Sequence, residues 1–548
     1  MDDFDSFYGC SLKTHYKRKG LCYTEDNIPV QKLFLSNIPK DLKKDTLVKH
    51  FNTFGGVQSV QIFYKVKQPS MRMGFVLFAN VIGAARALKN SSHRVNGHKI
   101  NVLSAHTWQQ PEIYGASEPT TAGDESGEAY ILKIPDDCLL MIIDFLPLAD
   151  QLFFQRVCQR FRSIYQLATR CKYKTVDYQM FENRSHWYIR EFFHILGPNV
   201  QHLNGSLRQR SIFKGPLLKC FGGNLINLKS LNLSGAKLTK DNLTKIFSST
   251  NKLEELMLDH CRLADESLLA LKDLKNLKTL NLAFNNSLSG LNLEKLPISI
   301  ESLNLSFCFK IQPDPIIQMC ESLTKLLNLS IAGVDPKTND RNFYNNLVKP
   351  NRCLSLQVLS ISTYDQCEDI AELPNLKKIH IANEMPEIFI NTGLFDQLAI
   401  FKSQQLEELK IDDANRINKQ MLLQIAKLTG LKTLWLYNVT DVDDDVVEAF
   451  TNLKKLERIN FDRGYFSDYN ILRLVLECPK LKELDLRFSP NITRKLVDDL
   501  IVKIPCYYKK NDREFPIILC LADIQYYDCP YEAPGQDIVK ILCHHNYL

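Results

Sequence analysis

A short pattern of apolar residues recurs eleven times between residues 228 and 486 of this 548-residue chain. Each copy holds an apolar residue, two variable positions, a second apolar residue, one variable position and a third apolar residue. The copies begin at Leu228, Leu253, Leu277, Ile300, Leu326, Leu356, Leu376, Leu406, Leu431, Leu456 and Leu481. Their starts are 20 to 30 residues apart, a period typical of units that each contain a short strand and a returning helix. One unit cannot bury its apolar face alone, so the pattern predicts a stacked solenoid.

The binding surface of this solenoid follows from the alternation of side chains along a strand. The apolar positions of each copy point inward, and the positions between them line the concave side. In the later copies these positions hold charged and aromatic residues, which are typical of protein-binding hot spots. The candidate substrate-binding residues are His380, Lys410, Asp412, Trp435, Tyr437, Asp462 and Arg487. We expect Asp412 and Asp462 to meet a positive charge of the target, and Arg487 an acid. Alternatively, a loop or the C-terminal segment covers Trp435 and Tyr437.

The repeats resemble leucine-rich repeats of the cysteine-containing type. The segment HCRLADESLLAL places Cys261 and an acidic residue ahead of a helix, as in that type, and later copies keep the frame without the cysteine. The resemblance implies an α/β solenoid over residues 176–548 with a C-terminal cap. Weaker copies at Val200 and Phe515 are expected to begin and end the stack.

Residues 31–105 form a second region, which is set apart by its charge. They hold nine Lys and three Arg against two Asp and no Glu, although the whole chain carries only +6. A local excess of positive charge is typical of a segment that binds a polyanion, and a solvated basic surface is the alternative. Stretches typical of strands and helices follow one another here as strand, helix, strand, strand, helix, strand.

This order resembles an RNA-recognition motif over residues 31–106. LFLSNI, at 33–38, matches the shorter ribonucleoprotein motif of that family, and MRMGFVLF, at 71–78, matches the longer one apart from Met71 and Met73. The resemblance implies an α+β ferredoxin-like fold in which Phe34 and Phe75 point out from the sheet and stack on bases of single-stranded RNA. Alternatively, the sheet binds protein, with Met73 as an adaptable apolar contact. The further candidate RNA-binding residues are Arg72, Lys65, Lys67 and Lys99.

Residues 107–130 separate this region from a helical one. They contain no Lys or Arg, five acidic residues and frequent Gly, Pro, Ser and Thr, which is typical of a flexible linker. Residues 1–30 are likewise expected to form a flexible tail. From Ile131 on, apolar residues have helical spacing, first after Pro135 and again from Ala149, with Pro147 between the two runs. The periodicity alone predicts a helical hairpin, and a cap for the repeats is its simplest role.

Residues 131–175 resemble an F-box. The opening IPDD, the corner FLPLADQL and the final RVCQRF follow the order of that family, with Ile134 in place of the usual leucine. The resemblance implies a small all-α module that docks on a Skp-type adaptor and so joins a cullin–RING ubiquitin ligase. Its apolar scaffold is expected to include both docking and core residues. They are Ile134, Pro135, Leu139, Ile142, Leu146, Leu148, Leu152, Val157 and Phe161.

Other functional classes receive no support from the sequence. The chain has no GxSxG, HExxH, P-loop or dinucleotide-binding motif, so we expect a non-catalytic protein without a cofactor. The sixteen cysteines form no CxxC pair, and the final CHH lacks a second ligand pair, so no metal site is expected. Neither a membrane span nor a secretory signal is expected, which favours a cytoplasmic or nuclear protein with reduced cysteines.

Together these expectations describe a multidomain chain with an α+β ferredoxin-like RNA-recognition motif, a small all-α F-box and an α/β leucine-rich-repeat solenoid. They predict the substrate-recognition subunit of an SCF-type (Skp–cullin–F-box) ubiquitin ligase, which holds a protein target on the repeats. The alternative is an RNA-binding adaptor or export-type protein that uses the repeats as an interaction scaffold. The F-box between the two other modules favours the ligase subunit.

Overall fold

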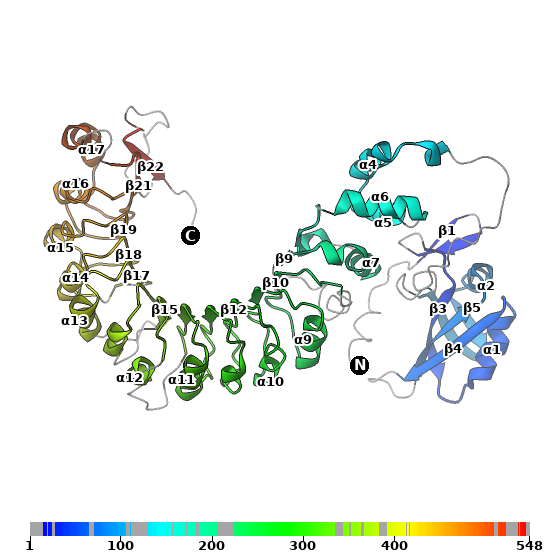
Figure 1. Ribbon diagram of the computed structural model, residues 1–548. Coiled ribbons are helices and arrows are strands. Elements are labelled where there is room, and N and C mark those ends of the chain that lie inside the picture. Colours follow the sequence, from blue (N-terminus) through cyan, green and yellow to red (C-terminus); the bar gives the residue numbers. More distant parts are fainter. Residues whose placement is uncertain are drawn as a thin grey trace. The chain divides into compact units, whose positions relative to one another are not determined.

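The computed structural model describes residues 15–18, 20–24, 28–64, 71–105, 110, 130–155, 157–170, 172–181, 186–205, 224–334, 343–349, 352–362, 367–382, 392–412, 414–415, 417–508, 513–521, 535 and 537–543. The chain divides into two compact units (Figure 1). The first comprises Met1–Val200 and Arg210–Leu225, and the second comprises Gln201–Gln209 and Ile226–Leu548. Each unit is described by itself.

The N-terminal module, residues 28–105, is a five-stranded antiparallel sheet in the order β4-β5-β3-β7-β6. Its elements are β3 (Lys32–Pro39), α1 (Lys44–Asn52), β4 (Val57–Tyr64), β5 (Met71–Phe78), α2 (Val81–Ala87), β6 (Ser92–Val95) and β7 (His98–Ser104). The predicted order of strands and helices is confirmed, and β6 is an additional short strand. Leu33, Leu35 and Val76 project from the central strands and pack with Leu47 and Phe51 of α1 in one core.

The predicted flexible tail does not extend to residue 30. Two short strands, β1 (Tyr16–Arg18) and β2 (Leu21–Tyr23), pair antiparallel ahead of the sheet. Cys22 and Val30 are buried in the same core as β3 and β5. The described part of this segment is therefore folded on the N-terminal module, and its apolar residues explain why.

Two histidines are hydrogen-bonded to each other beside α1. His93 Nε2 lies 2.9 Å from the carbonyl oxygen of Ala87, so this nitrogen must carry the proton and donate it. In neutral His93 the Nδ1 atom then accepts, and His50 Nε2 donates to it across 3.1 Å. Burial, and then the neighbouring His93, lower the pKa of His50 below its ordinary value.

Acidification is expected to destabilise the N-terminal module through this pair. In the unfolded chain His50 takes up a proton near its ordinary pKa of about 6.5, whereas the folded module keeps it neutral to lower pH. The stabilisation is therefore complete above about pH 6.5 and is lost as the pH falls below that value. Urea denaturation of the full chain between about pH 7.5 and 5.5 measures the effect. A His50→Gln variant should show a weaker pH dependence, and an unchanged one would contradict this account.

The helical module, residues 130–170, contains three α-helices rather than the predicted hairpin. After the 3₁₀ turn η2 (Tyr130–Lys133) come α4 (Asp136–Phe145), α5 (Leu148–Phe154) and α6 (Gln159–Thr169). The second predicted helix is divided, since Cys158 has an extended backbone and begins α6. The rings of Phe154 and Phe161 stack across this break with centroids 4.2 Å apart. β8 (Thr175–Asp177), η3 (Tyr178–Phe181), α7 (His186–Leu196) and η4 (Gly197–Asn199) complete the first unit.

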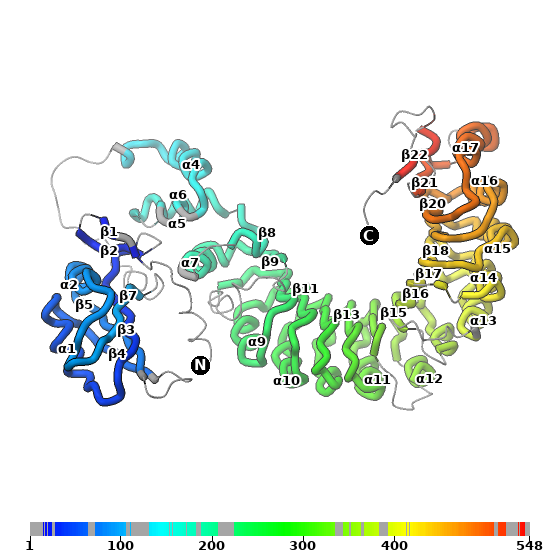
Figure 2. The backbone as a smooth tube through the Cα atoms, turned by 180° about the vertical axis from the view of Figure 1, so that it is seen from behind, coloured from blue at the N-terminus to red at the C-terminus, as the bar shows by residue number. Residues whose placement is uncertain are grey.

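In the second unit the strands β9 to β22 are paired in parallel and in sequence order, with the helices on the outer side (Figure 2). The strands are β9 (His202–Asn204), β10 (Ser230–Asn232), β11 (Glu255–Met257), β12 (Thr279–Asn281), β13 (Ser302–Asn304), β14 (Asn328–Ser330), β15 (Val358–Ile361), β16 (Lys378–Ile381), β17 (Glu408–Ile411), β18 (Thr433–Leu436), β19 (Arg458–Asn460), β20 (Glu483–Asp485), β21 (Ile517–Leu521) and β22 (Val539–Cys543). The helices are α9 (Lys240–Phe247), α10 (Asp265–Leu268), η6 (Leu293–Lys295), α11 (Pro313–Ser322), α12 (Phe343–Val348), η7 (Glu368–Glu372), α13 (Thr392–Phe401), α14 (Lys419–Ile425), α15 (Asp444–Phe450), α16 (Asp468–Glu477) and α17 (Arg494–Tyr507). The solenoid prediction is confirmed, and the weaker copies at Val200 and Phe515 form β9 and β21. The copy at Phe515 does not end the stack, however, because β22 pairs beyond β21.

The repeats stack with equivalent residues in register, so that Leu231 lies beside Leu256 and Leu256 beside Leu280. The turn after each strand leaves a buried carbonyl that the next repeat must satisfy. Cys261 Sγ donates to the carbonyl of Leu233 at 3.1 Å, and Asn285 Nδ2 donates to that of Leu258 at 2.9 Å. Cysteine and asparagine thus perform one task at the same position of these two repeats.

No helix in the described part of the chain is long and apolar enough to cross a membrane. Within the same residues no group of three or more His, Cys, Asp or Glu side chains is arranged to hold a metal ion. His544 and His545 of the final CHH lie outside them.

Candidate interaction sites

The sheet face opposite the helices carries the aromatic residues that the sequence singles out. Phe34, Met73 and Phe75 form a cluster with Ala105 and the half-buried Phe63, apart from the main core. However, Phe34 is only 3% exposed and Phe75 only 7%, with their ring centroids 5.5 Å apart. The expectation that these rings are open for stacking is therefore wrong for this structure, although they lie on the expected face.

Gln110 holds the chain that follows β7 against the start of β3. Its side chain is fully buried, and Oε1 accepts hydrogen bonds from the backbone N–H groups of Gln31 and Lys32 at 2.9 and 2.8 Å. Its Nε2 donates to the carbonyls of Lys32 and Ala105 at 3.0 and 2.8 Å. Lys32 Nζ in turn lies 4.7 Å from the centre of the Phe75 ring, and burial lowers the pKa of this amine. The aromatic face is thus bordered by residues of the chain itself.

The basic residues expected to bind RNA differ in their contacts and exposure. Arg72 donates from Nη2 to the carbonyls of Pro39 and Leu42 at 2.7 and 2.5 Å. Its guanidinium therefore fixes the turn between β3 and α1, and its proposed phosphate contact is not supported. Lys99 is exposed on β7. Lys65 and Lys67 lie outside the described residues.

The residues that match the F-box scaffold differ in their exposure within the helical module. Three are buried (Leu139, Leu152 and Phe161), four are half-buried (Ile134, Ile142, Leu146 and Leu148) and two are exposed (Pro135 and Val157). The buried three belong to the core of the module. The exposed and half-buried residues are the ones that remain accessible to a partner.

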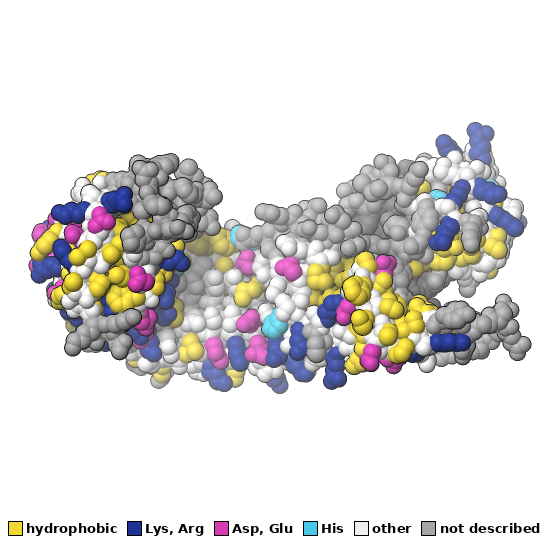
Figure 3. Space-filling view, turned by 90° about the horizontal axis from the view of Figure 1, so that it is seen from above, with side chains coloured by type: hydrophobic (Ala, Val, Ile, Leu, Met, Phe, Trp, Pro, Cys, Tyr) yellow, Lys and Arg dark blue, Asp and Glu magenta, His cyan; other side chains and the backbone are white. Residues whose placement is uncertain are grey.

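Two further exposed apolar residues are not among the docking residues predicted from the sequence. On α4, Met141 is 63% exposed and Phe145 is 86% exposed. Large apolar side chains gathered on a small module indicate an interaction surface (Figure 3). The signal was present in the sequence, because Met141 and Phe145 fall outside the helical stripe that Leu139 and Ile143 bury.

Arg160 of α6 fixes the segment that leads into α4. It donates from Nε to Asp136 Oδ1 at 2.9 Å, from Nη1 to the carbonyl of Leu132 at 2.5 Å and from Nη2 to that of Ile134 at 2.6 Å. This rigid, planar fork of donors holds three points of the segment at once, whereas a lysine would direct its donors from a single rotatable nitrogen. Arg160 therefore positions residues that the F-box resemblance assigns to docking.

Replacing Arg160 by alanine is expected to weaken adaptor binding about tenfold. Without its hydrogen bonds the segment 132–136 is no longer held in place, and ordering it on docking reduces the free energy of binding. Titration of the purified chain with a Skp-type adaptor measures this. Arg162→Ala is the matched control, since Arg162 is exposed on the same helix. Equal affinities of the two variants would show that the fork has no role in docking.

In the second unit, Trp435 lies among side chains of the concave face. Lys410 Nζ is 4.8 Å from the centre of its ring, and the ring of Tyr437 packs edge-on with centroids 5.7 Å apart. Lys410 is also paired with Glu408 at 2.9 Å. Trp435 is half-buried as a result, and a cation of the protein itself already occupies one of its faces.

The charged residues around this tryptophan are partly neutralised. Arg487 donates to both carboxylate oxygens of Asp485 at 2.7 to 3.1 Å, so the expectation that it meets an acid of the target is not supported. His380 Nε2 lies 2.8 Å from Asp412 Oδ2. Asp462 is 9% exposed and accepts from the backbone N–H of Asn438, and burial raises the pKa of its carboxyl. Within the described ranges, neither Asp412 nor Asp462 is paired with a Lys or Arg.

A groove of about 460 Å³ crosses the concave face from β13 to the end of β17. Its floor is small and polar, one wall carries Phe284 and Phe307, and one end is formed by His380 and Asp412. The floor residues are Ser302, Asn304, Ser306, Asn328, Ser330 and Ser360. The charged end is predicted from the sequence, whereas the aromatic wall is not, although the recurring endings LNLAF and LNLSF are its signal in the sequence.

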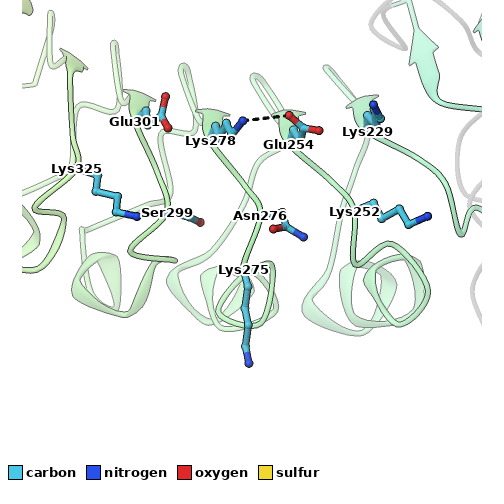
Figure 4. A pocket seen from close by; sticks show the side chains of 9 residues that line it. All are labelled: Lys229, Lys252, Glu254, Lys275, Asn276, Lys278, Ser299, Glu301 and Lys325. Atoms are coloured by element: carbon cyan, nitrogen blue, oxygen red, sulfur yellow. Dashed lines mark hydrogen bonds and ion pairs between the residues drawn. The ribbon is translucent and has the colours of Figure 1, made fainter.

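A second hollow lies on the flank where the strands begin (Figure 4). Here the first variable position of successive repeats alternates in charge, as Lys229, Glu254, Lys278 and Glu301. Lys278 Nζ is 3.3 Å from Glu254 Oε2. Because each lysine has an acid on a neighbouring strand, this row supports stacking rather than presenting a uniform positive surface.

Comparison with known proteins agrees with the modules described above. A model of the RNA recognition motif matches residues 33–101, and a model of the F-box domain matches residues 131–164. Among solved structures, an internalin from Listeria monocytogenes is similar at 21% identity over 50% of this chain and 77% of that one, with a TM-score of 0.30. The third RNA-recognition domain of Mip6 is 23% identical over 14% of this chain and 94% of its own, with a TM-score of 0.13. The PID-3 TOFU-6 RRM domain complex is 22% identical over 15% and 98%, with a TM-score of 0.14.

The chain therefore carries an RNA recognition motif, an F-box and a leucine-rich-repeat solenoid, in that order. The matches to the first two modules cover less than half of the chain, and the repeats follow from the parallel sheet and its register.

Proposed function

We propose that this protein is the substrate-recognition subunit of an SCF-type ubiquitin ligase. The observation that carries the proposal is the exposed apolar surface of the F-box, where Met141, Phe145 and Val157 are all more than half exposed. A surface of this kind is unfavourable in water and favours a partner that covers it. A Skp-type adaptor is the partner that an F-box implies, and through it the cullin–RING ligase.

The proposed mechanism is proximity rather than chemistry by this chain. The repeats hold the target protein while the ligase, bound through the F-box, modifies lysines of that target. Such a subunit needs no cofactor and no catalytic residue. It would act in the cytoplasm, the nucleus or both.

RNA binding is proposed as a second, conditional activity of the N-terminal module. Phe34 and Phe75 lie on the face that this kind of module uses for bases, but they are covered. RNA would therefore bind only when these rings are uncovered, which includes moving Lys32, held at its backbone by Gln110, away from Phe75.

Affinity purification of the tagged full chain, read by mass spectrometry with and without ribonuclease, tests the proposal. A ligase subunit should recover a Skp-type adaptor and a cullin in both samples. The alternative, an RNA-binding adaptor or export-type protein, should instead recover partners that disappear with ribonuclease and no Skp-type adaptor. That second result would refute the ligase proposal.

A further inference from the structure

The aromatic wall of the concave groove presents ring edges rather than ring faces. His260 and Phe284 are stacked with centroids 4.2 Å apart, and Phe284 and Phe307 are stacked at 4.7 Å. On the next repeat Gly333 approaches Phe307 so closely that an added Cβ would lie 2.5 Å from the ring. A nucleic-acid base or a sugar therefore finds no free face on which to stack. An aliphatic or aromatic side chain can still pack against the edges.

The floor of the groove offers hydrogen-bonding groups that the protein leaves unused. The side chains of Ser302, Asn328 and Ser360 are half-buried and have no hydrogen-bond partner among the residues that the structure describes. Asn304 accepts a bond from the backbone N–H of Ser306, while its Nδ2 donates to no described residue. Neutral donors and acceptors without charge are suited to the backbone of an extended peptide.

The far end of the groove is anionic. The Asp412 side chain is 44% exposed, and its ion-pair partner among the described residues is His380, which is charged only if protonated. Asp462, two repeats beyond Asp412, is only 9% exposed, so Asp412 is the carboxylate that a bound side chain can reach. It favours a cationic side chain and disfavours the phosphates of RNA.

We propose that the groove binds an extended peptide segment of the target that carries an apolar side chain and, about six residues away, a Lys or Arg. The separation follows from the fold. Phe307 follows β13 and Asp412 follows β17, so four strand spacings of about 4.8 Å, or roughly 19 Å, lie between them. An extended chain covers this distance at about 3.3 Å per residue. The inference rests on the proposed function, since it describes the target that the ligase subunit holds.

Labelled peptides with one Phe and one Arg in a Ser/Gly background test this proposal, with separations from about two to about nine residues. Fluorescence polarisation with the full chain should give the tightest binding near a separation of six. Replacing Arg by Glu in that peptide should weaken binding about tenfold. A flat dependence on separation, equal binding of the Arg and Glu peptides, or no binding of any peptide would overturn the proposal.

Two variants of the chain locate the binding site. Asp412→Asn should reduce the affinity for the Arg peptide about tenfold. It should leave the affinity for a peptide with Ser in place of Arg unchanged. Ser360→Tyr should block every peptide, because a large side chain then fills the floor. Tyr469→Ala is the control, since Tyr469 is 68% exposed on α16 and does not line the groove. Binding that survives Ser360→Tyr would place the peptide elsewhere and refute this site.

The peptide assay contains no adaptor, so its result is independent of the proposed function. Both variants should bind the adaptor as tightly as the wild type does. This measurement also shows that the two variants are folded. A wild-type chain that binds the peptides but no adaptor would refute the ligase role and leave the groove assignment intact.

Discussion

A chain carrying Met141→Asp and Phe145→Asp is expected to lose a Skp-type adaptor, with its affinity reduced more than about a hundredfold. Both side chains are largely exposed, at 63% and 86%, so their replacement removes little from the core of the F-box. In a docked interface, however, each carboxylate would be taken out of water without a partner. Titration of the purified chain with the adaptor measures the loss.

The matched control is Ile298→Asp, which places the same charge at a residue that is 68% exposed on the solenoid. It should bind the adaptor like the wild type. Thermal melting should be nearly the same for all three proteins, because exposed substitutions cost little stability. If the double variant keeps the adaptor, the surface of α4 is not the docking face.

Replacing Gln110 by alanine is expected to raise the affinity of the chain for single-stranded RNA by about tenfold or more. Four hydrogen bonds of its buried amide are lost, so the backbone of Lys32 is no longer held and its amine can leave the ring of Phe75, which becomes more accessible. Stacking on each ring then contributes about 1–3 kcal/mol. Fluorescence anisotropy with a labelled oligonucleotide at low salt measures the change.

Gln31→Ala serves as the control for this variant. Gln31 lies beside the same strand, but its side chain donates to Phe78 rather than to the segment after β7. Adding Phe34→Ala and Phe75→Ala to Gln110→Ala should remove the gain and leave a weak interaction that falls steeply with salt. If Gln110→Ala binds no better than Gln31→Ala, the covered face is not an RNA platform and a protein ligand is favoured.

The periodic parts of this fold could be predicted because their signal is local. Three apolar positions per repeat define each strand, and the same residues, such as Leu231 and Leu256, then stack in register. In the N-terminal module the motif around Phe75 likewise identified its strand and its face correctly. These features depend on neighbours within a few residues.

The accessibility of the candidate residues could not be predicted, because it depends on distant partners. The ring of Phe75 lies under Lys32, whose backbone is bonded to Gln110, 78 residues away in sequence. Arg72 was a candidate for a phosphate contact but satisfies the backbone carbonyls of Leu42 and Pro39, 30 and 33 residues away in sequence. In the F-box, periodicity could not separate Leu139 from Val157, since both are apolar and only packing distinguishes them.

The alternating charges on the flank of the solenoid restrict how this surface can change in length. After two uncharged positions, Leu327 and Gln357, the alternation resumes as Lys377, Glu407, Lys432, Glu457 and Lys482. Lys432 Nζ lies 2.8 Å from Glu407 Oε2. Deleting or duplicating a single repeat within either run would place like charges on adjacent strands, whereas a change of two repeats would preserve the order. Natural or engineered relatives of this protein should therefore gain and lose these repeats in pairs.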